Sequence, residues 1–235
     1  MSNKTPIGFV LMGVLVIASL PITLWTIFVH APIEMQMGIA QKIFYFHAPC
    51  AYAMYVGFVV CGVASLVHLI TRKESWEALA VAGAEVGLLF CVMVLFQGML
   101  WARKAWGVYW TWDPRLSSTL LAALIFTSYV VLRSIGAGGA GERRFAAGLA
   151  IVGALELPLI HYSVKLWRGQ HPTVLRQTGG EGLAPEMGHA FLAGFLFFTV
   201  LVIWLLWARM RLERQRQAVR ALELDAMERG LLEDS

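Results

Sequence analysis

The sequence predicts an all-α integral membrane protein with six transmembrane helices and both termini in the cytoplasm. Of its 235 residues, 58% are hydrophobic and 14% are charged, whereas ordinary soluble domains have roughly 25% charged residues. Six apolar runs approach or exceed the length of about 20 residues that a helix needs to cross the hydrocarbon of a bilayer. The basic residues are also unevenly distributed among the segments that join these runs.

The six predicted spans leave no room for a soluble domain, so we predict a single membrane domain over residues 1–207. The spans are Ile7 to Val29, Ala51 to Ile70, Ala78 to Trp101, Thr119 to Leu132, Phe145 to Tyr162 and Ala190 to Trp207. We extend the short fourth span back through Leu116, because Ser117 and Ser118 can bond to the preceding helical turn. The first run is too long for a signal peptide and lacks a small-residue cleavage site, which indicates a retained helix.

The distribution of basic residues predicts the orientation of the chain. Cytoplasmic segments of membrane proteins are enriched in Lys and Arg, and a cytoplasmic amino terminus puts twelve of the 19 inside and seven outside. The external loops are then about 30–50, 102–117 and 163–188. The mixed-charge tail, 208–235, begins ARMRLERQR and suits a helix touching anionic lipid. Because this distribution matters more than the net charge of +4, we predict contacts with membrane lipid and none with nucleic acid.

The three cysteines are interpreted as small buried hydrophobes. Cys50, Cys61 and Cys91 lie in or at the edge of predicted spans and form no CxxC or CxxCH pattern. The sequence therefore gives little support to a thiol–disulfide function or to covalently attached haem.

The external segment WGVYWTWDPRLSS, residues 106–118, is the most unusual feature of the chain. Its tryptophans could belong to an aromatic belt at the headgroup level. As a helix, Trp106 and Trp110 share a face with Asp113; as an extended segment, Trp106, Trp110 and Trp112 share one. We expect a broad flat aromatic surface in either case, which suits a large planar hydrophobic ligand.

The end of this segment has both a structural and a functional interpretation. Asp113 followed by Pro114 is typical of a helix start, with Asp as N-cap and Pro at the first helical position. Such a cap would also fix the angle between the tryptophans and the membrane. Arg115 could pair with Asp113, extend to the headgroups, or bind a ligand carboxylate such as a haem propionate.

Histidines gather on the predicted external side. Five of the six fall in or near the external loops and only His68 lies toward the cytoplasm, the five being His30, His47, His161, His171 and His189. A single histidine is commonly structural, yet imidazole is also a common protein ligand to haem iron. Pro49 and Pro172 restrict the backbone near His47 and His171, but spacing alone does not select this pair.

Two carboxylates, Glu85 and Glu156, fall within predicted spans. Ionisable groups are costly there and usually face the interior of the helix bundle. They are either functional groups or protonated and hydrogen-bonded packing elements, with Glu156 satisfying backbone freed by Pro158. The sequence does not separate these interpretations.

These residues resemble the haem-handling membrane proteins of cytochrome c maturation that share a tryptophan-rich "WWD" segment. The match comprises Trp106-Gly107-x-x-Trp110-x-Trp112-Asp113-x-Arg115-Leu116, and its Arg-Leu-Ser ending is more similar to the CcmC branch than to CcmF or CcsA. The stretch QKIFYFHAP, residues 41–49, is similar to the first external histidine motif. LPLIHYSV, residues 157–164, with Trp167 and His171, is similar to the approach to the second.

The resemblance implies a bacterial inner-membrane protein that binds haem b non-covalently at the periplasmic face and passes it on. His47 and His171 would be the axial iron ligands, and Trp106, Trp110, Trp112, Asp113 and Arg115 would contact the haem. The implied recipient is the haem chaperone CcmE, and the implied partners are CcmA, CcmB and CcmD. The chain would then be a transport protein and not an enzyme.

Two alternatives belong to other classes of protein. A cytochrome c haem lyase of CcmF or CcsA type would be expected to have more spans and further histidines. A b-type electron carrier would need paired histidines deep in facing spans, for which the sequence offers only His68 and His161.

Overall fold

The computed structural model describes residues 5–136, 139–171 and 183–231, and in these residues the chain is helical with short connections. The helices are α1 (Ile7–Trp25), η1 (Thr26–His30, a π-helix), η2 (Ile39–Ile43, a 3-10 helix), α2 (Phe44–Thr71), α3 (Glu74–Trp106), α4 (Pro114–Ile135), α5 (Ala140–Trp167) and α6 (Pro185–Glu228). Six of these segments, with η1 continuing α1 and η2 leading into α2, are long and apolar enough to cross a membrane. The predicted all-α, six-span fold is confirmed.

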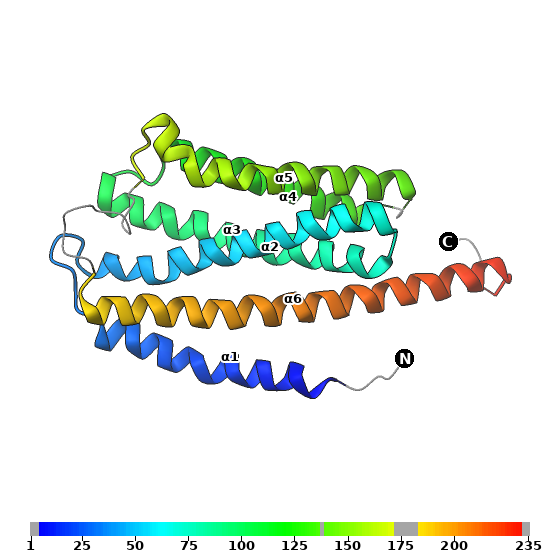
Figure 1. The fold of residues 1–235 in the computed structure, drawn as a ribbon, viewed down its shortest axis with the longest axis horizontal. Helices are drawn as coiled ribbons and strands as arrows, with labels where there is room; N and C mark the ends of the chain where they lie inside the picture. Colours follow the sequence, from blue (N-terminus) through cyan, green and yellow to red (C-terminus); the bar gives the residue numbers. More distant parts are fainter. Residues whose placement is uncertain (1–4, 137–138, 172–182, 232–235) are drawn as a thin grey trace.

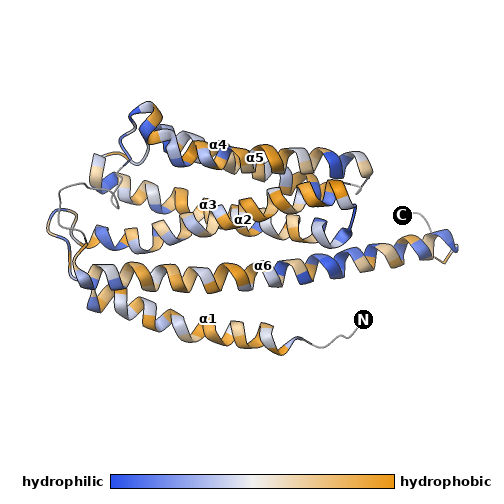
Figure 2. Cartoon of the chain, viewed as in Figure 1, coloured by the Kyte–Doolittle hydropathy of each residue, from blue (hydrophilic) through white to orange (hydrophobic). Residues whose placement is uncertain are grey.

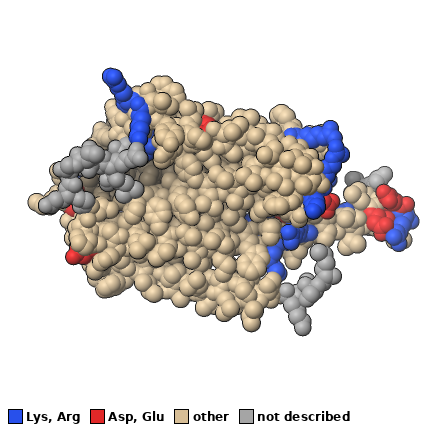
Figure 3. Space-filling model, in the orientation of Figure 1, with Lys and Arg blue, Asp and Glu red and all other residues tan. Residues whose placement is uncertain are grey.

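The six long helices lie side by side along one axis (Figure 1). α2 and α3 form the centre, α4 and α5 cover one side, and α6 separates the centre from α1. Apolar residues predominate along the middle of the helices, and the second half of α6 is hydrophilic (Figure 2). The face drawn in Figure 3 is almost free of charged side chains between its two ends. This distribution is expected of helices that face hydrocarbon.

Close backbone contact joins α2 to α3. A Cβ atom on Gly57 would lie 2.5 Å from the Cα of Gly87, so small residues are required where the two helices cross. Beside this contact, the rings of Phe58 and Phe126 stack with their centroids 3.7 Å apart and so connect α2 to α4. Cys50, Cys61 and Cys91 are fully buried and free, as predicted.

Several helices are longer than predicted. α2 begins at Phe44 and α5 continues to Trp167, because polar and aromatic residues at the ends of the apolar runs continue the helix beyond the hydrocarbon. α4 begins at Pro114, with the Asp113 side chain accepting the backbone N–H of Arg115 at 2.9 Å. The predicted helix start is therefore confirmed, and Ser118 bonds to the preceding turn as expected.

The end of η1, which continues α1, is capped by a lysine from η2. Lys42 is 5% exposed, and its Nζ donates hydrogen bonds to the carbonyls of Ile27, Phe28 and Ala31 at 2.7, 3.1 and 3.0 Å. Carbonyls at a helix end lack intrahelical partners. Lys42 therefore satisfies them and fixes η1 against η2, a role that the sequence analysis did not predict.

Candidate functional site

Three connections meet at one end of the bundle, at the left of Figure 1. They are the segment between η1 and η2, the segment between α3 and α4 that holds the tryptophans, and residues 168–171, which follow α5. Both termini lie toward the opposite end. The fold therefore brings together the three loops that we predicted to be external. The side of the membrane that they face stays a prediction.

His47 lies in the first turn of α2 and not in a loop as predicted. Pro49 cannot donate a helical hydrogen bond to the carbonyl of Tyr45, and Gly194 of α6 packs at this point, where a Cβ would lie 2.5 Å from that carbonyl oxygen. Gly98 of α3 leaves room for the His47 ring, because a Cβ there would lie 3.3 Å from its Cε1. The ring therefore packs against α3, and the first turn of α2 that carries it packs against α6.

His47 and His171 face each other across the site. Their ring centroids are 6.4 Å apart and the ring planes are inclined by 28°. Within the described residues, Nδ1 of His47 is buried and has no hydrogen-bond partner. A buried imidazole nitrogen normally has a partner, so this atom is a candidate ligand atom. Pro172, the predicted restraint on His171, lies outside the described residues.

Asp113 connects the tryptophan segment to His171. Its side chain is buried; while Oδ1 caps α4, Oδ2 accepts the backbone N–H of Gln170 at 2.6 Å and lies 3.4 Å from the backbone nitrogen of His171. Gly169 allows this approach, because a Cβ there would lie 2.6 Å from Oδ2. The aspartate therefore links the start of α4 to the backbone of Gln170 and His171.

The guanidinium of Arg115 contacts His171 and the backbone of His161. One terminal nitrogen lies 3.2 Å from Nδ1 of His171, and the other donates to the carbonyl of His161 at 2.9 Å. Arginine has only donors, so Nδ1 of His171 is the acceptor. A neutral His171 then has its proton on Nε2. We considered three roles for Arg115: an ion pair with Asp113, extension to the headgroups, and binding of a ligand carboxylate. The structure shows none of them directly. The guanidinium instead contacts His161 and His171.

The tryptophans do not form one flat surface, and this expectation was wrong. α3 ends at Trp106, Gly107 adopts a left-handed φ of 78°, and the chain then runs without helix to Asp113. Trp106 packs edge-on against Trp101 at 89°, and Trp110 against Trp112 at 84°. Edge-to-face contact is favoured because the positive edge of one ring meets the negative face of the other. The Trp112 ring is 79% exposed.

The other three external histidines have different partners from His47 and His171. His30 and His189 stack at 5.5 Å with ring nitrogens 3.2 Å apart, and Trp25 stacks on His30. His161 packs against Tyr162. No sequence signal marks the His30–His189 pair, since these residues lie in η1 and α6, far apart in the chain. His68 lies in the last turn of α2, at the opposite end from His161, which argues against a b-type pair.

The two carboxylates within the spans differ. Glu85 forms an ion pair with Arg209 of α6. Glu156 is 8% exposed, and neither of its carboxyl oxygens has a hydrogen-bond partner within the described residues. An ionised carboxylate without a partner is costly at that depth. Neither residue contacts the paired histidines in the described part of the chain.

These features define a class of protein: a polytopic helical membrane protein with two histidines and a tryptophan-rich segment at one end. A family model described as heme exporter protein C, CcmC, matches residues 4–225. The chain therefore belongs to the CcmC family, and the resemblance noted in the sequence is confirmed.

Curated relatives cover most of the chain. Heme exporter protein C of Bradyrhizobium diazoefficiens is 35% identical over 195 residues, which is 83% of this chain and 74% of the relative. The protein of the same name from Rhodobacter capsulatus is 29% identical over 88% of this chain and 86% of its own length. That of Escherichia coli K12 is 28% identical over 78% of this chain and 74% of its own length.

Proposed function

We propose that this chain binds haem b non-covalently between His47 and His171 and passes it to a haem chaperone of the CcmE type. Membership of the heme exporter protein C family supports a role in haem delivery for cytochrome c maturation, and a transport protein requires no catalytic residue. The haem is cargo and must leave, so the site has to bind it with moderate affinity.

The histidine pair is the observation that carries the proposal. Two nitrogens that bind one metal ion from opposite sides lie about 4 Å apart, at about 2 Å per bond, and each ring centre lies behind its nitrogen. A centroid separation of 6.4 Å therefore leaves room for one iron. The unpartnered buried Nδ1 of His47 supports the same interpretation, because ligation through this nitrogen would give it the partner that it lacks.

Haem binding requires Arg115 to leave His171. If iron takes Nδ1, the arginine loses its acceptor. If iron takes Nε2, the proton moves to Nδ1, which then cannot accept from a guanidinium that only donates. The released guanidinium is free to bind a carboxylate through two parallel hydrogen bonds. We infer that the Arg115 guanidinium leaves His171 and binds a haem propionate. Ligation of the iron by His171 is thereby coupled to binding of the propionate by Arg115.

The tryptophan segment supplies the outer surface of the site. Trp106 and Trp110 are half-buried, whereas Trp112 is 79% and Tyr109 55% exposed. Half-buried rings suit apolar contact with a porphyrin, and exposed rings suit contact with the protein that removes it. Transfer is easier from a site that opens to solvent on one side.

The remaining elements of the proposal concern location and partners. We infer a bacterial inner membrane, with the histidine end facing the periplasm and both termini in the cytoplasm; the excess of Lys and Arg at the termini end supports this orientation. The assembly would contain CcmA, CcmB and CcmD, with CcmE as recipient. The exposed helix faces in the middle of the bundle fit lipid or these membrane subunits.

The test is the haem spectrum of single variants. Protein should be purified with haem as the wild type, His47→Ala and His171→Ala, with His68→Ala at the opposite end of the bundle as matched control. We expect each site variant to lose the six-coordinate Soret spectrum and to transfer less haem to the chaperone. His68→Ala should retain both.

The same experiment distinguishes the alternatives. Wild-type spectra and transfer in both site variants would refute ligation by this pair. If spectra change but transfer does not, the pair binds haem outside the delivery route, and the proposed hand-off is wrong. Covalent attachment of haem to a CxxCH peptide by the purified chain would indicate a lyase instead.

A further inference from the structure

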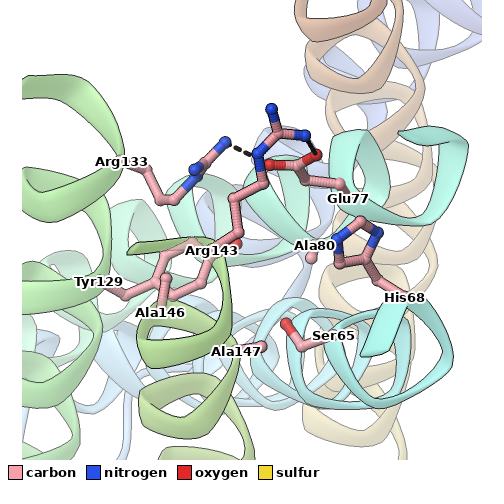
Figure 4. Close-up of a pocket in the computed structure, with 9 residues that line it drawn as sticks. All are labelled: Ser65, His68, Glu77, Ala80, Tyr129, Arg133, Arg143, Ala146 and Ala147. Carbon is pink, nitrogen blue, oxygen red and sulfur yellow. Dashed lines mark hydrogen bonds and ion pairs between the residues drawn. The ribbon is translucent and has the colours of Figure 1, made fainter. Parts of the chain in front are cut away.

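A network of charged residues lies at the other end of the bundle, where α3, α4 and α5 meet (Figure 4). Glu77 accepts from Arg133 at 2.5 Å and from Arg143 at 3.1 Å, and Arg133 also pairs with Glu142 at 3.1 Å. Both terminal nitrogens of Arg133 are therefore occupied. Its Nε is buried and has no partner within the described residues, although the side chain is only 7% exposed.

A cavity of about 250 Å³ lies beside this network, between α3, α4 and α6. Its lining is mainly charged and consists of Val81, Glu85, Tyr129, Val130, Arg133, Ser134, Glu213, Arg216 and Arg220. Arg133 therefore belongs both to the buried ion network and to the wall of the cavity. The lining contains three arginines and two glutamates, so it has an excess of positive charge.

One face of α6 supplies the opposite wall. Glu213, Arg216 and Arg220 are spaced three and four residues apart, which puts them on the same side of a helix. Glu213 is 5% exposed and lies 3.8 Å from Arg216. Glu85 is already paired with Arg209, which lies one turn before Glu213 on that face. Arg220 is exposed and forms no ion pair with a carboxylate in the described part of the chain, so its guanidinium is available to a bound anion.

The cavity lies at the level where phospholipid headgroups are expected. α6 has 44 residues and is therefore about 66 Å long at 1.5 Å per residue, whereas the hydrocarbon of a bilayer is about 30 Å thick. Its apolar part ends at Trp207, and the hydrophilic part that follows runs past the ends of the other helices (Figure 2). The residues of α6 that line the cavity begin at Glu213, six positions after Trp207, which is about 9 Å further along the helix.

We propose that this cavity binds the phosphate headgroup of an anionic phospholipid. The exposed Arg216 and Arg220 would bind the phosphate oxygens, and Arg133 adds positive charge to the wall of the same cavity. Arginine clusters at this level of a membrane protein are suited to anionic headgroups. The volume is below the roughly 300–1,000 Å³ of sites for whole small molecules, so the cavity fits a headgroup and not a haem.

The test measures retention of lipid by the full chain in detergent. Wild-type protein should be incubated with phosphatidylglycerol or phosphatidylcholine, and bound lipid counted by native mass spectrometry. The site variant is Arg216→Gln with Arg220→Gln. The matched control is Arg214→Gln with Arg229→Gln, which removes the same charge from α6 and from the residue that caps its end, both outside the lining.

We expect the wild type and the control to retain phosphatidylglycerol over phosphatidylcholine, and the site variant to need at least ten-fold more phosphatidylglycerol for the same occupancy. If millimolar inorganic phosphate displaces the bound phosphatidylglycerol, the cavity is a phosphate site, but its ligand is a soluble phosphate and not a lipid. Equal retention of the two lipids by the wild type, or equal loss in the site and control variants, would overturn the proposal. The haem spectrum is independent of all these outcomes.

Discussion

Replacement of Asp113 by serine separates the two roles of this carboxylate. In the native chain Oδ1 caps α4, and Oδ2 accepts the backbone N–H of Gln170 at 2.6 Å. A serine hydroxyl can still cap the helix, but it is too short to reach Gln170. The variant Asp113→Ser should therefore keep the start of α4 but no longer hold Gln170 and His171 against it.

The magnitude follows from the lost hydrogen bond. A hydrogen bond to a charged group contributes about 1.5–3 kcal/mol, and each 1.4 kcal/mol corresponds to about ten-fold in affinity. If the bond serves to hold His171 opposite His47, its loss should weaken haem binding by about 10- to 100-fold. The iron should also become partly five-coordinate, because the His171 ring no longer has a fixed position.

The assay is haem titration followed in the Soret band, together with thermal unfolding in detergent. Asp113→Ala is the companion variant, since it loses the cap as well and should unfold with about 1 kcal/mol less stability than Asp113→Ser. Both variants should bind haem equally weakly. A serine variant with wild-type haem affinity and spectrum would refute the proposed connection between Asp113 and His171.

Three further perturbations test the packing around the site. Gly98→Ala should displace the His47 ring by a few tenths of an ångström and weaken haem binding about five-fold, which corresponds to about 1 kcal/mol. Gly148→Ala is the control, because a Cβ there would meet nothing within 4 Å. It should leave the haem titration unchanged. Lys42→Met leaves three helix-end carbonyls without their donor and should lower the free energy of unfolding by about 3 kcal/mol; an unchanged melting temperature would contradict the capping role. Hydrogen bonds from two backbone N–H groups lower the pKa of the exposed Glu34 carboxyl, so its small contribution to stability should be complete above the ordinary pKa and lost as the pH falls through the lowered one. Acid unfolding curves of the wild type and Glu34→Gln should therefore converge only at low pH.

Much of the fold follows from the sequence because the bilayer imposes it. A run such as Ala78 to Trp101 has to be helical in hydrocarbon, since every backbone N–H and C=O must be bonded within the segment. Asp113 and Pro114 likewise specify the start of α4 through local chemistry. Helix ends were less predictable, and His47 lies within α2 because helices continue beyond the apolar run that signals them.

The arrangement of side chains across the bundle was decided only by the tertiary structure. The sequence identified five histidines near one side, and the family resemblance selected His47 and His171. The packing of η1 against α6 then brought His30 to His189 as a separate pair. The contact of Arg115 with His171, which joins residues 56 positions apart, has no sequence signal. Local patterns determine helices and caps because those depend on neighbours in the chain, whereas such contacts depend on which helices pack together.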